Sequence, residues 1–145
     1  EASFSPVPEL ALFAGGVLIA GDADAYPSGP DARPVTEPID LLMPTTLRGG
    51  ARWSGLGERL LLEAVVEHAE AQDELSTRDK QDTQRIPPGG TPGYTVLDLR
   101  SAWRVAPSFT LSLALDNVFD QDYRIHGSGV NEPGRNLVAT AMLQF

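Results

Sequence analysis

The sequence has 145 residues, no cysteine, and 20 acidic against 11 lysine and arginine side chains, for a formal net charge of −9. The lack of cysteine excludes a disulfide framework and a thiolate metal site, and an acidic chain without a basic stripe repels a phosphate backbone, which disfavours nucleic-acid binding. Its 14 glycines and 12 prolines cut the chain into short runs, and no apolar run reaches the roughly 18 residues of a membrane helix. This composition favours an all-β fold.

Six segments are predicted to be strands, each close to the roughly 10 residues that a tilted membrane strand needs. In chain order they are residues 9–21, 44–53, 58–71, 93–105, 108–118 and 134–145. The links between them are short at 54–57 and 106–107, and long at 22–43, 72–92 and 119–133. Short turns alternating with long loops are typical of outer-membrane barrels, although a soluble sandwich can also mix loop lengths.

The strands alternate apolar and polar residues, so that each has two different faces. In 108–118, Phe109, Leu111, Leu113 and Leu115 share a face opposite Thr110, Ser112, Ala114 and Asp116. In the three preceding strands the second face carries Arg48, Arg52, Glu63, Glu67, Asp98, Arg100 and Arg104. Charges of both signs on neighbouring strands can pair across a wet interior, whereas a dry sandwich core would not accept so many.

Two tryptophans fall at strand ends beside the short turns. Trp53 precedes the link at 54–57, and Trp103 precedes the link at 106–107. An indole at such a position can sit at a membrane interface. Ordinary core or surface tryptophans would give the same sequence pattern, so both interpretations stay open.

The closing part of the chain carries a specific motif. Asp116-Asn117-Val118-Phe119-Asp120-Gln121-Asp122-Tyr123-Arg124 is followed by Pro133-Gly134-Arg135-Asn136 and a final strand ending in Phe145. This segment resembles the closing segment of TonB-dependent outer-membrane receptors, as does the Pro/Gly-rich stretch 84–94 before a strand that bears Asp98. The signature residues that match are Asn117, Phe119, Asp120, Tyr123, Gly134, Arg135 and Phe145.

Physical roles can be predicted for several signature residues. Asn117 and Asp120 are expected to bond turn amides where strand becomes loop. Tyr123 is expected to anchor the loop at the outer membrane interface. Gly134 is expected to supply a backbone conformation costly for other residues, and Arg135 to hold a carboxylate of the returning loop.

The resemblance implies an antiparallel meander that forms about the last six strands of a transmembrane barrel of about 22, with residues 1–145 as the C-terminal part of the barrel domain. The N-terminal plug and the segment that contacts TonB would belong to a longer parent. Such a receptor takes up a scarce ligand, such as an iron siderophore, haem or cobalamin, across the outer membrane of a Gram-negative bacterium. Its other partners would be membrane lipid and the barrel-insertion machinery, which reads a last strand ending in Phe145.

The three long loops are the candidates for contact with a small-molecule ligand, whose identity the sequence does not indicate. The residues singled out in them are Arg85, Arg124, His126 and Asn131. No cofactor is implied. Catalysis is not expected, because His126 and Ser128 are close in sequence without an evident orienting acid. The aspartate pairs at 22/24 and 120/122 lack the spacing of a calcium loop and are interpreted as solvated carboxylates.

Two alternatives remain for the whole chain. One is a complete soluble all-β binding module of carbohydrate-binding type, in which apolar strand faces pack against each other. The other is a small outer-membrane pore barrel of about eight to twelve strands. If the chain is a barrel fragment, it should aggregate in water, because two sheet edges and an apolar face are left exposed.

Overall fold

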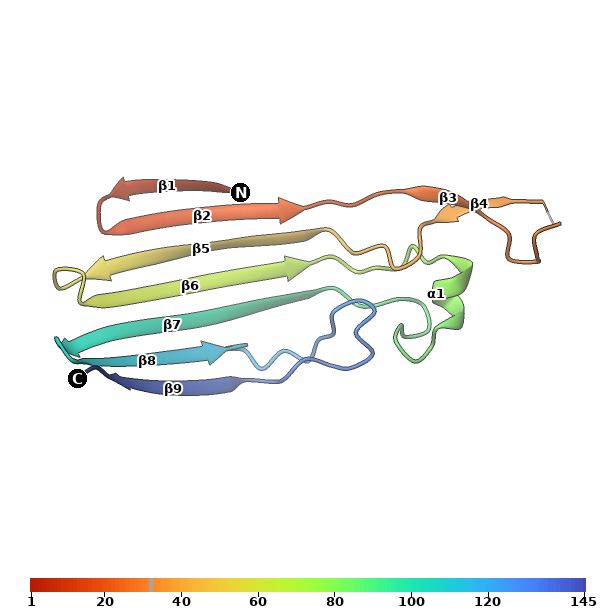
Figure 1. The fold of residues 1–145 in the computed structure, drawn as a ribbon. Helices are drawn as coiled ribbons and strands as arrows, with labels where there is room; N and C mark the ends of the chain where they lie inside the picture. Colours follow the sequence, from red (N-terminus) through yellow and green to blue (C-terminus); the bar gives the residue numbers. More distant parts are fainter. Residues whose placement is uncertain (32) are drawn as a thin grey trace.

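One antiparallel sheet dominates the computed structural model, which describes residues 1–31 and 33–145. Residue 32, inside the predicted loop 22–43, lies outside the described residues. The strands of this sheet are β1 (Ala2–Val7), β2 (Leu10–Val17), β5 (Thr46–Gly55), β6 (Leu60–Ala69), β7 (Tyr94–Ala106), β8 (Phe109–Asp116) and β9 (Asn136–Leu143). Each strand pairs with its neighbours in chain order, with β1 at one edge and β9 at the other, so the sheet is an open meander (Figure 1).

The six predicted strands are confirmed, with ends that differ by a few residues, but three strands and a helix were missed. The missed edge strand β1 contains two serines and Pro6, which hide the expected alternation. The prediction of a plain loop over 22–43 was wrong, since β3 (Asp22–Ala25) and β4 (Val35–Pro38) pair there as a separate hairpin. The loop 72–92 contains a short helix, α1 (Thr77–Gln81).

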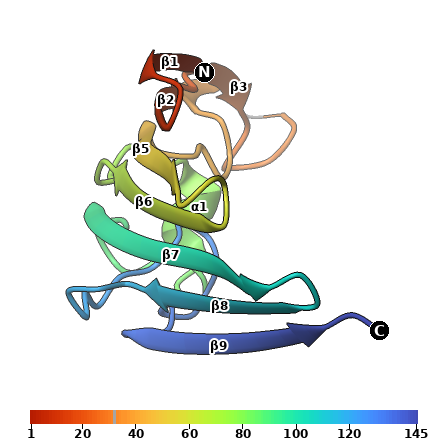
Figure 2. The ribbon, with the colours of Figure 1, turned by 90° about the vertical axis from the view of Figure 1, so that its left-hand side faces the viewer.

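The connections within the large sheet separate by length onto its two ends. The turns at 8–9, 56–59 and 107–108 lie at one end. The long connections, residues 18–45, 70–93 and 117–135, lie at the other and are called the outer loops below (Figure 1). Figure 2 shows the sheet from the end of the short turns, with α1 behind it. This arrangement confirms the predicted alternation of turns and loops.

The register of the strands places apolar side chains on one face. A single row crosses all seven strands through Phe4, Leu12, Ala51, Ala64, Leu99, Leu115 and Leu137. Several large side chains of this face are more than a third exposed, including Leu62, Leu113, Trp53 and Trp103. No second layer covers them among the described residues, so the sheet presents a broad apolar surface that a soluble monomer rarely exposes.

Most of the buried core lies at the outer-loop end of the sheet. Leu42, Leu75 and Ile86 come from the outer loops, Ala69 and Val96 come from the adjacent strand ends, and Val65 comes from the middle of β6. Helix α1 begins with a capping box, in which the Ser76 side chain accepts from the Asp79 backbone and the Asp79 side chain accepts from the Ser76 backbone. The loops therefore pack into a defined unit. In residues 1–31 and 33–145 no helix has the length and apolarity needed to cross a membrane.

If the apolar face meets lipid, a charge in its centre should disrupt folding far more than the same charge on the opposite face. Leu113 and Ser112 are neighbours in the middle of β8 on opposite faces. In the native protein, Leu113→Arg should cost about 2–4 kcal/mol, whereas Ser112→Arg should cost much less. The measurement is the amount of folded, heat-modifiable protein recovered from outer membranes. Equal losses for the two variants would contradict a lipid-facing surface.

Candidate functional site

The face opposite the apolar one is organised around Glu63, whose side chain is only 10% exposed. Its carboxylate accepts from Arg52 Nε at 2.8 Å and Nη2 at 2.6 Å. Arg100 Nη1 lies 3.8 Å from the other oxygen of Glu63. The second terminal nitrogen of Arg100 lies 3.9 Å from both Asp98 and Asp116. The predicted cross-strand pairing of opposite charges is thus confirmed, with Arg100 shared between three carboxylates.

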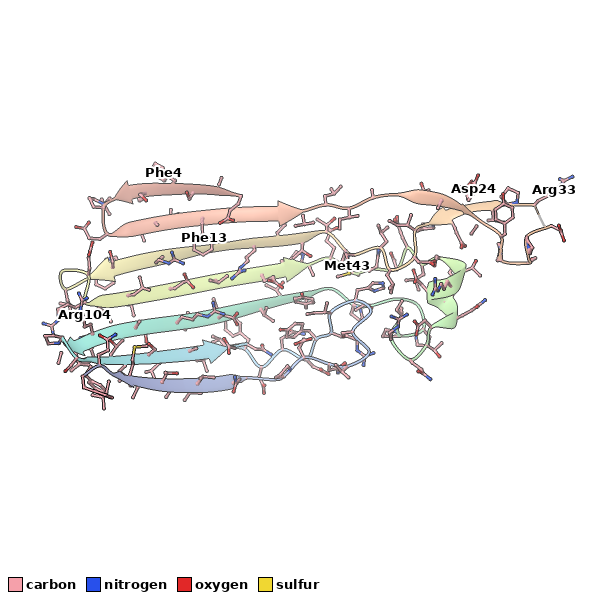
Figure 3. All side chains as sticks on the ribbon, viewed as in Figure 1. Phe4, Phe13, Asp24, Arg33, Met43 and Arg104 are labelled. Atoms are coloured by element: carbon pink, nitrogen blue, oxygen red, sulfur yellow. The ribbon has the colours of Figure 1, made fainter. Side chains whose placement is uncertain are left out.

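A cavity of about 510 Å³ lies over this charged face. Its lining includes three arginines, Arg48, Arg52 and Arg100, together with Glu1, Glu63 and Phe13. Figure 3 labels Phe13 on β2. The volume falls within the range of about 300–1,000 Å³ that is usual for small-molecule sites. Arginine fits such a place because its guanidinium stays charged and can bond an anion with two nitrogens. This face therefore suits a polar or anionic occupant.

The first two outer loops are joined through Asp79. Its carboxylate accepts the backbone N–H of Leu41 at 3.1 and 3.2 Å, and the side chain is 3% exposed. Leu41 needs such support because its φ of 55° lies in the left-handed region, which is unfavourable for a leucine. Four residues before Leu41, Glu37 accepts from both the backbone and the hydroxyl of Thr77, at 2.9 and 2.6 Å. These bonds fix the hairpin segment against α1.

The signature residues Asn117 and Asp120 act as predicted, by bonding backbone groups where β8 becomes loop. Both adopt a positive φ, of 51° and 58°. Asn117 is buried, donates to the Gln121 carbonyl at 2.9 Å and accepts the Gln121 N–H at 2.9 Å. Asp120 accepts the backbone N–H of Arg135 at 2.7 Å, which ties the start of the third outer loop to its end.

Gly134 and Arg135 also act where the third outer loop returns to the sheet, but their physical roles differ from the predicted ones. Gly134 is not among the glycines with a positive φ. A glycine is needed here for lack of space, since a Cβ on residue 134 would lie 2.6 Å from Asp120 Oδ1. The Arg135 guanidinium donates from Nε to the Val118 carbonyl at 2.8 Å and does not hold the carboxylate. Both residues therefore shape the close approach of the returning chain.

Tyr123 lies on the charged side of the sheet through its contact with Tyr94, and its anchoring at the membrane interface stays a prediction. Its ring packs against Tyr94, with 4.4 Å between centroids. The Tyr94 hydroxyl donates to Glu67 at 3.0 Å, on the charged face. Burial raises the pKa of Tyr123, with Glu132 and Asp98 adding to the effect. Of the remaining signature residues, Phe119 is 72% exposed and Phe145 follows β9 fully exposed.

The structure separates the four predicted ligand-contact residues into three places. Arg85 is paired with Asp82, which lies close in the same loop, and by donating this bond Arg85 lowers the pKa of the Asp82 carboxyl. His126 is buried and bonded to Thr91, at 2.9 Å between Nδ1 and Oγ1, so it is not at the surface. Arg124 and Asn131 are brought together, as described next.

Arg124 and Asn131 form a bonded chain with Asp122. Arg124 Nε donates to Asn131 Oδ1 at 2.9 Å, and Asn131 Nδ2 donates to Asp122 Oδ1 at 2.8 Å. These three residues and Tyr123 line a cavity of about 310 Å³ together with prolines and glycines of the second outer loop, Pro87, Pro88, Gly90, Pro92 and Gly93. The chain of bonds orients the guanidinium beside an apolar wall, an arrangement suited to a small ligand with a polar edge.

The features that would indicate catalysis or metal binding are not seen in the described part of the chain. The Ser128 hydroxyl donates to the Val130 carbonyl at 2.8 Å and so does not face His126. No group of three or more His, Asp or Glu side chains is placed to hold a metal ion within residues 1–31 and 33–145. The residues that sequence reasoning missed are Ser76, Asp79 and Thr91. The spacing Ser76-x-x-Asp79 is a capping signal that could have revealed α1.

Comparison with known proteins identifies the fold. No protein-family model matches the sequence, and no curated protein sequence matches it significantly. Three solved structures resemble it over 99% of its length at 16% identity: the copper transporter OprC (TM-score 0.70), the ferric enterobactin receptor PfeA (0.64) and the ferric-catecholate import receptor Fiu from E. coli K12 (0.59). The chain spans only 22%, 21% and 19% of these proteins. It has the fold of a segment of a TonB-dependent receptor barrel.

The close approach of Gly134 and Asp120 can be tested by adding a methyl group. Gly134→Ala should displace the Asp120 carboxylate and lose its bond to the Arg135 N–H, which costs about 1 kcal/mol. Protease cleavage within 119–133 should then speed up about fivefold in the native protein. Gly21→Ala is the control, because a Cβ there meets only ordinary contacts at 3.6 Å. Unchanged cleavage in Gly134→Ala would refute the spatial role.

Proposed function

We propose that this chain is the C-terminal part of the barrel of a TonB-dependent outer-membrane receptor, which takes up a scarce ligand such as an iron siderophore, haem or cobalamin. The observation that carries the proposal is the open seven-stranded meander with one apolar face, one charged face and all long loops at one end. The likeness to OprC, PfeA and Fiu over 99% of the chain supports it. In such a protein the chain supplies barrel wall and three outer loops.

The two edges of the sheet support a longer parent protein. Both β1 and β9 have a neighbour on one side only. In a membrane every backbone N–H and C=O must be bonded, so an open sheet cannot span the bilayer by itself. Further strands of the parent would pair with both edges and close a barrel of about 22 strands. The chain matches only about a fifth of each receptor's length, which also supports a longer parent.

The proposed partners follow from the two faces and the ends of the parent. The apolar face would contact lipid, and the charged face would line the lumen beside an N-terminal plug. TonB would contact the N-terminal region of the parent and supply the energy for release of the ligand. The barrel-insertion machinery would bind β9 and the exposed Phe145 that follows it. Of the alternatives, a soluble sandwich is disfavoured by the uncovered apolar face.

We assign ligand contact to the cavity beside Arg124 and Asn131. The names of the structural neighbours suggest two probes, a ferric catecholate such as ferric enterobactin and a copper salt. An anionic catecholate would gain charge-assisted bonds from the oriented guanidinium of Arg124, worth about 1.5–3 kcal/mol. Arg85 and His126 stay lesser candidates, since one is ion-paired and the other buried.

This assignment predicts that Arg124→Gln weakens binding of ferric enterobactin by the purified native protein about tenfold or more. Copper binding should be unchanged by the same substitution, because a guanidinium is not a copper ligand. Lys80→Gln, on the exposed side of α1, is the control that removes a positive charge elsewhere in the outer loops. Equal affinity of the Arg124→Gln variant and the native protein for ferric enterobactin would remove Arg124 from the site.

The receptor proposal is tested by the size and location of the native polypeptide. An antibody raised against residues 72–145 is used to probe separated cell membranes. A band several times larger than 15.5 kDa in the outer membrane is expected. A band near 15.5 kDa in a soluble fraction would overturn the proposal and favour the binding module, and a band of intermediate size in the outer membrane would favour a small pore.

A further inference from the structure

His126 lies where all three outer loops meet. Its Nδ1 is bonded to Thr91 Oγ1 at 2.9 Å, which joins the third outer loop to the second. Thr91 is itself fixed by paired backbone bonds with Gln72, both of 2.9 Å. The next residue, Gly127, packs beneath Leu41 of the first loop, where a Cβ would lie 3.2 Å from the leucine methyl. The imidazole therefore occupies the junction that fastens the loops together.

The second nitrogen of this ring lacks a partner. The residue is 5% exposed, and Nε2 is the one buried side-chain nitrogen or oxygen in the described residues without a hydrogen bond. A neutral imidazole tolerates such a position at modest cost. A protonated imidazole has two N–H donors, so the charge would be buried with one donor unsatisfied. A small cavity of about 20 Å³ beside the ring has room for no more than a water molecule.

The charged and titratable groups around the ring do not supply that missing partner. From α1, Asp79 favours the protonated form, but its carboxylate is already bonded to Leu41. Glu70, Tyr94 and Arg124 line the small cavity from the second loop, β7 and the third loop. The first loop contributes Met43 and Pro44 there, which do not titrate. Burial outweighs Asp79 and lowers the pKa of His126 below its ordinary value of 6.5.

We propose that His126 is a proton-sensitive latch, which holds the outer loops together while its ring is neutral and releases the third loop when the surroundings acidify. The direction of this pH dependence follows from the linkage between protonation of the ring and opening of the loop. In the open loop the ring regains its ordinary pKa, so the closed state keeps its full stability above about pH 6.5 and loses it as the pH falls toward the lowered value. At a pH below the lowered pKa, each unit by which loop closure lowers the pKa of His126 multiplies the equilibrium constant for opening about tenfold.

The test is hydrogen exchange of the outer-loop peptides in the purified full-length protein, compared at about pH 7.5 and about pH 5.5 after correction for intrinsic exchange rates. The native protein should show several-fold more opening of 117–135 at the lower pH. His126→Gln, which keeps a polar side chain but cannot titrate, should lose this dependence. His68→Gln is the matched control, because His68 is the other histidine of the chain and lies exposed on β6, bonded to Thr95.

A second measurement covers the case in which His126→Gln does not fold. Histidine modification of the native protein by diethyl pyrocarbonate, located by peptide mass, compares His126 with His68 in one sample. His126 should react much more slowly at about pH 7.5, and the ratio of its rate to that of His68 should rise toward about pH 5.5. Three results would each overturn the latch. The first is a ratio of the His126 and His68 modification rates that does not change with pH, and the second is hydrogen exchange of 117–135 that does not change with pH. The third is a pH dependence of this exchange that is abolished by His68→Gln and not by His126→Gln. None of these outcomes bears on whether the parent is a receptor.

Discussion

The alternation of side chains between the two faces of each strand, with a period of two residues, constrains every other feature of this molecule. Because successive side chains point to opposite faces, one register error would exchange the apolar and charged faces of a strand. The register shifts only near two of the short turns, in the β1–β2 and β7–β8 pairs, and the row from Phe4 to Leu137 crosses all seven strands and is apolar throughout. The sheet thus separates a lipid-compatible surface from a charged one without a second layer of structure.

The charged face stays compatible with folding because its charges compensate one another. Glu63 is the least exposed carboxylate of these ion pairs, and it is flanked by Arg52 and Arg100 on the two neighbouring strands. Directly opposed residues on adjacent strands are close enough for such pairs. Exposed pairs contribute little to stability, so this network mainly balances the charges that are gathered on one face of the sheet. The arginines over the cavity are shared with carboxylates, so an anionic occupant would have to compete with Glu63, Asp98 and Asp116 for them.

The outer loops show how a polar segment can be ordered without a conventional apolar core. Three aliphatic side chains, Leu42, Leu75 and Ile86, are buried there, and the rest of the packing uses hydrogen bonds to Asp79, Asn117 and His126. Such a unit is rigid while every buried polar group has a partner and becomes sensitive where one does not. The unpartnered Nε2 of His126 is that point.

The sequence by itself determined six of the strands, their faces and the order of short and long connections, since alternation and turn residues act within a few positions of the chain; it missed β1, β3, β4 and α1. It also identified the motif from Asn117 to Arg135, although not why Gly134 is needed. Only the tertiary structure decided the partners inside the outer loops. Asp79 meets Leu41 across 38 positions, and His126 meets Thr91 across 35. Such contacts depend on how separate loops pack in space, which no local pattern of residues specifies.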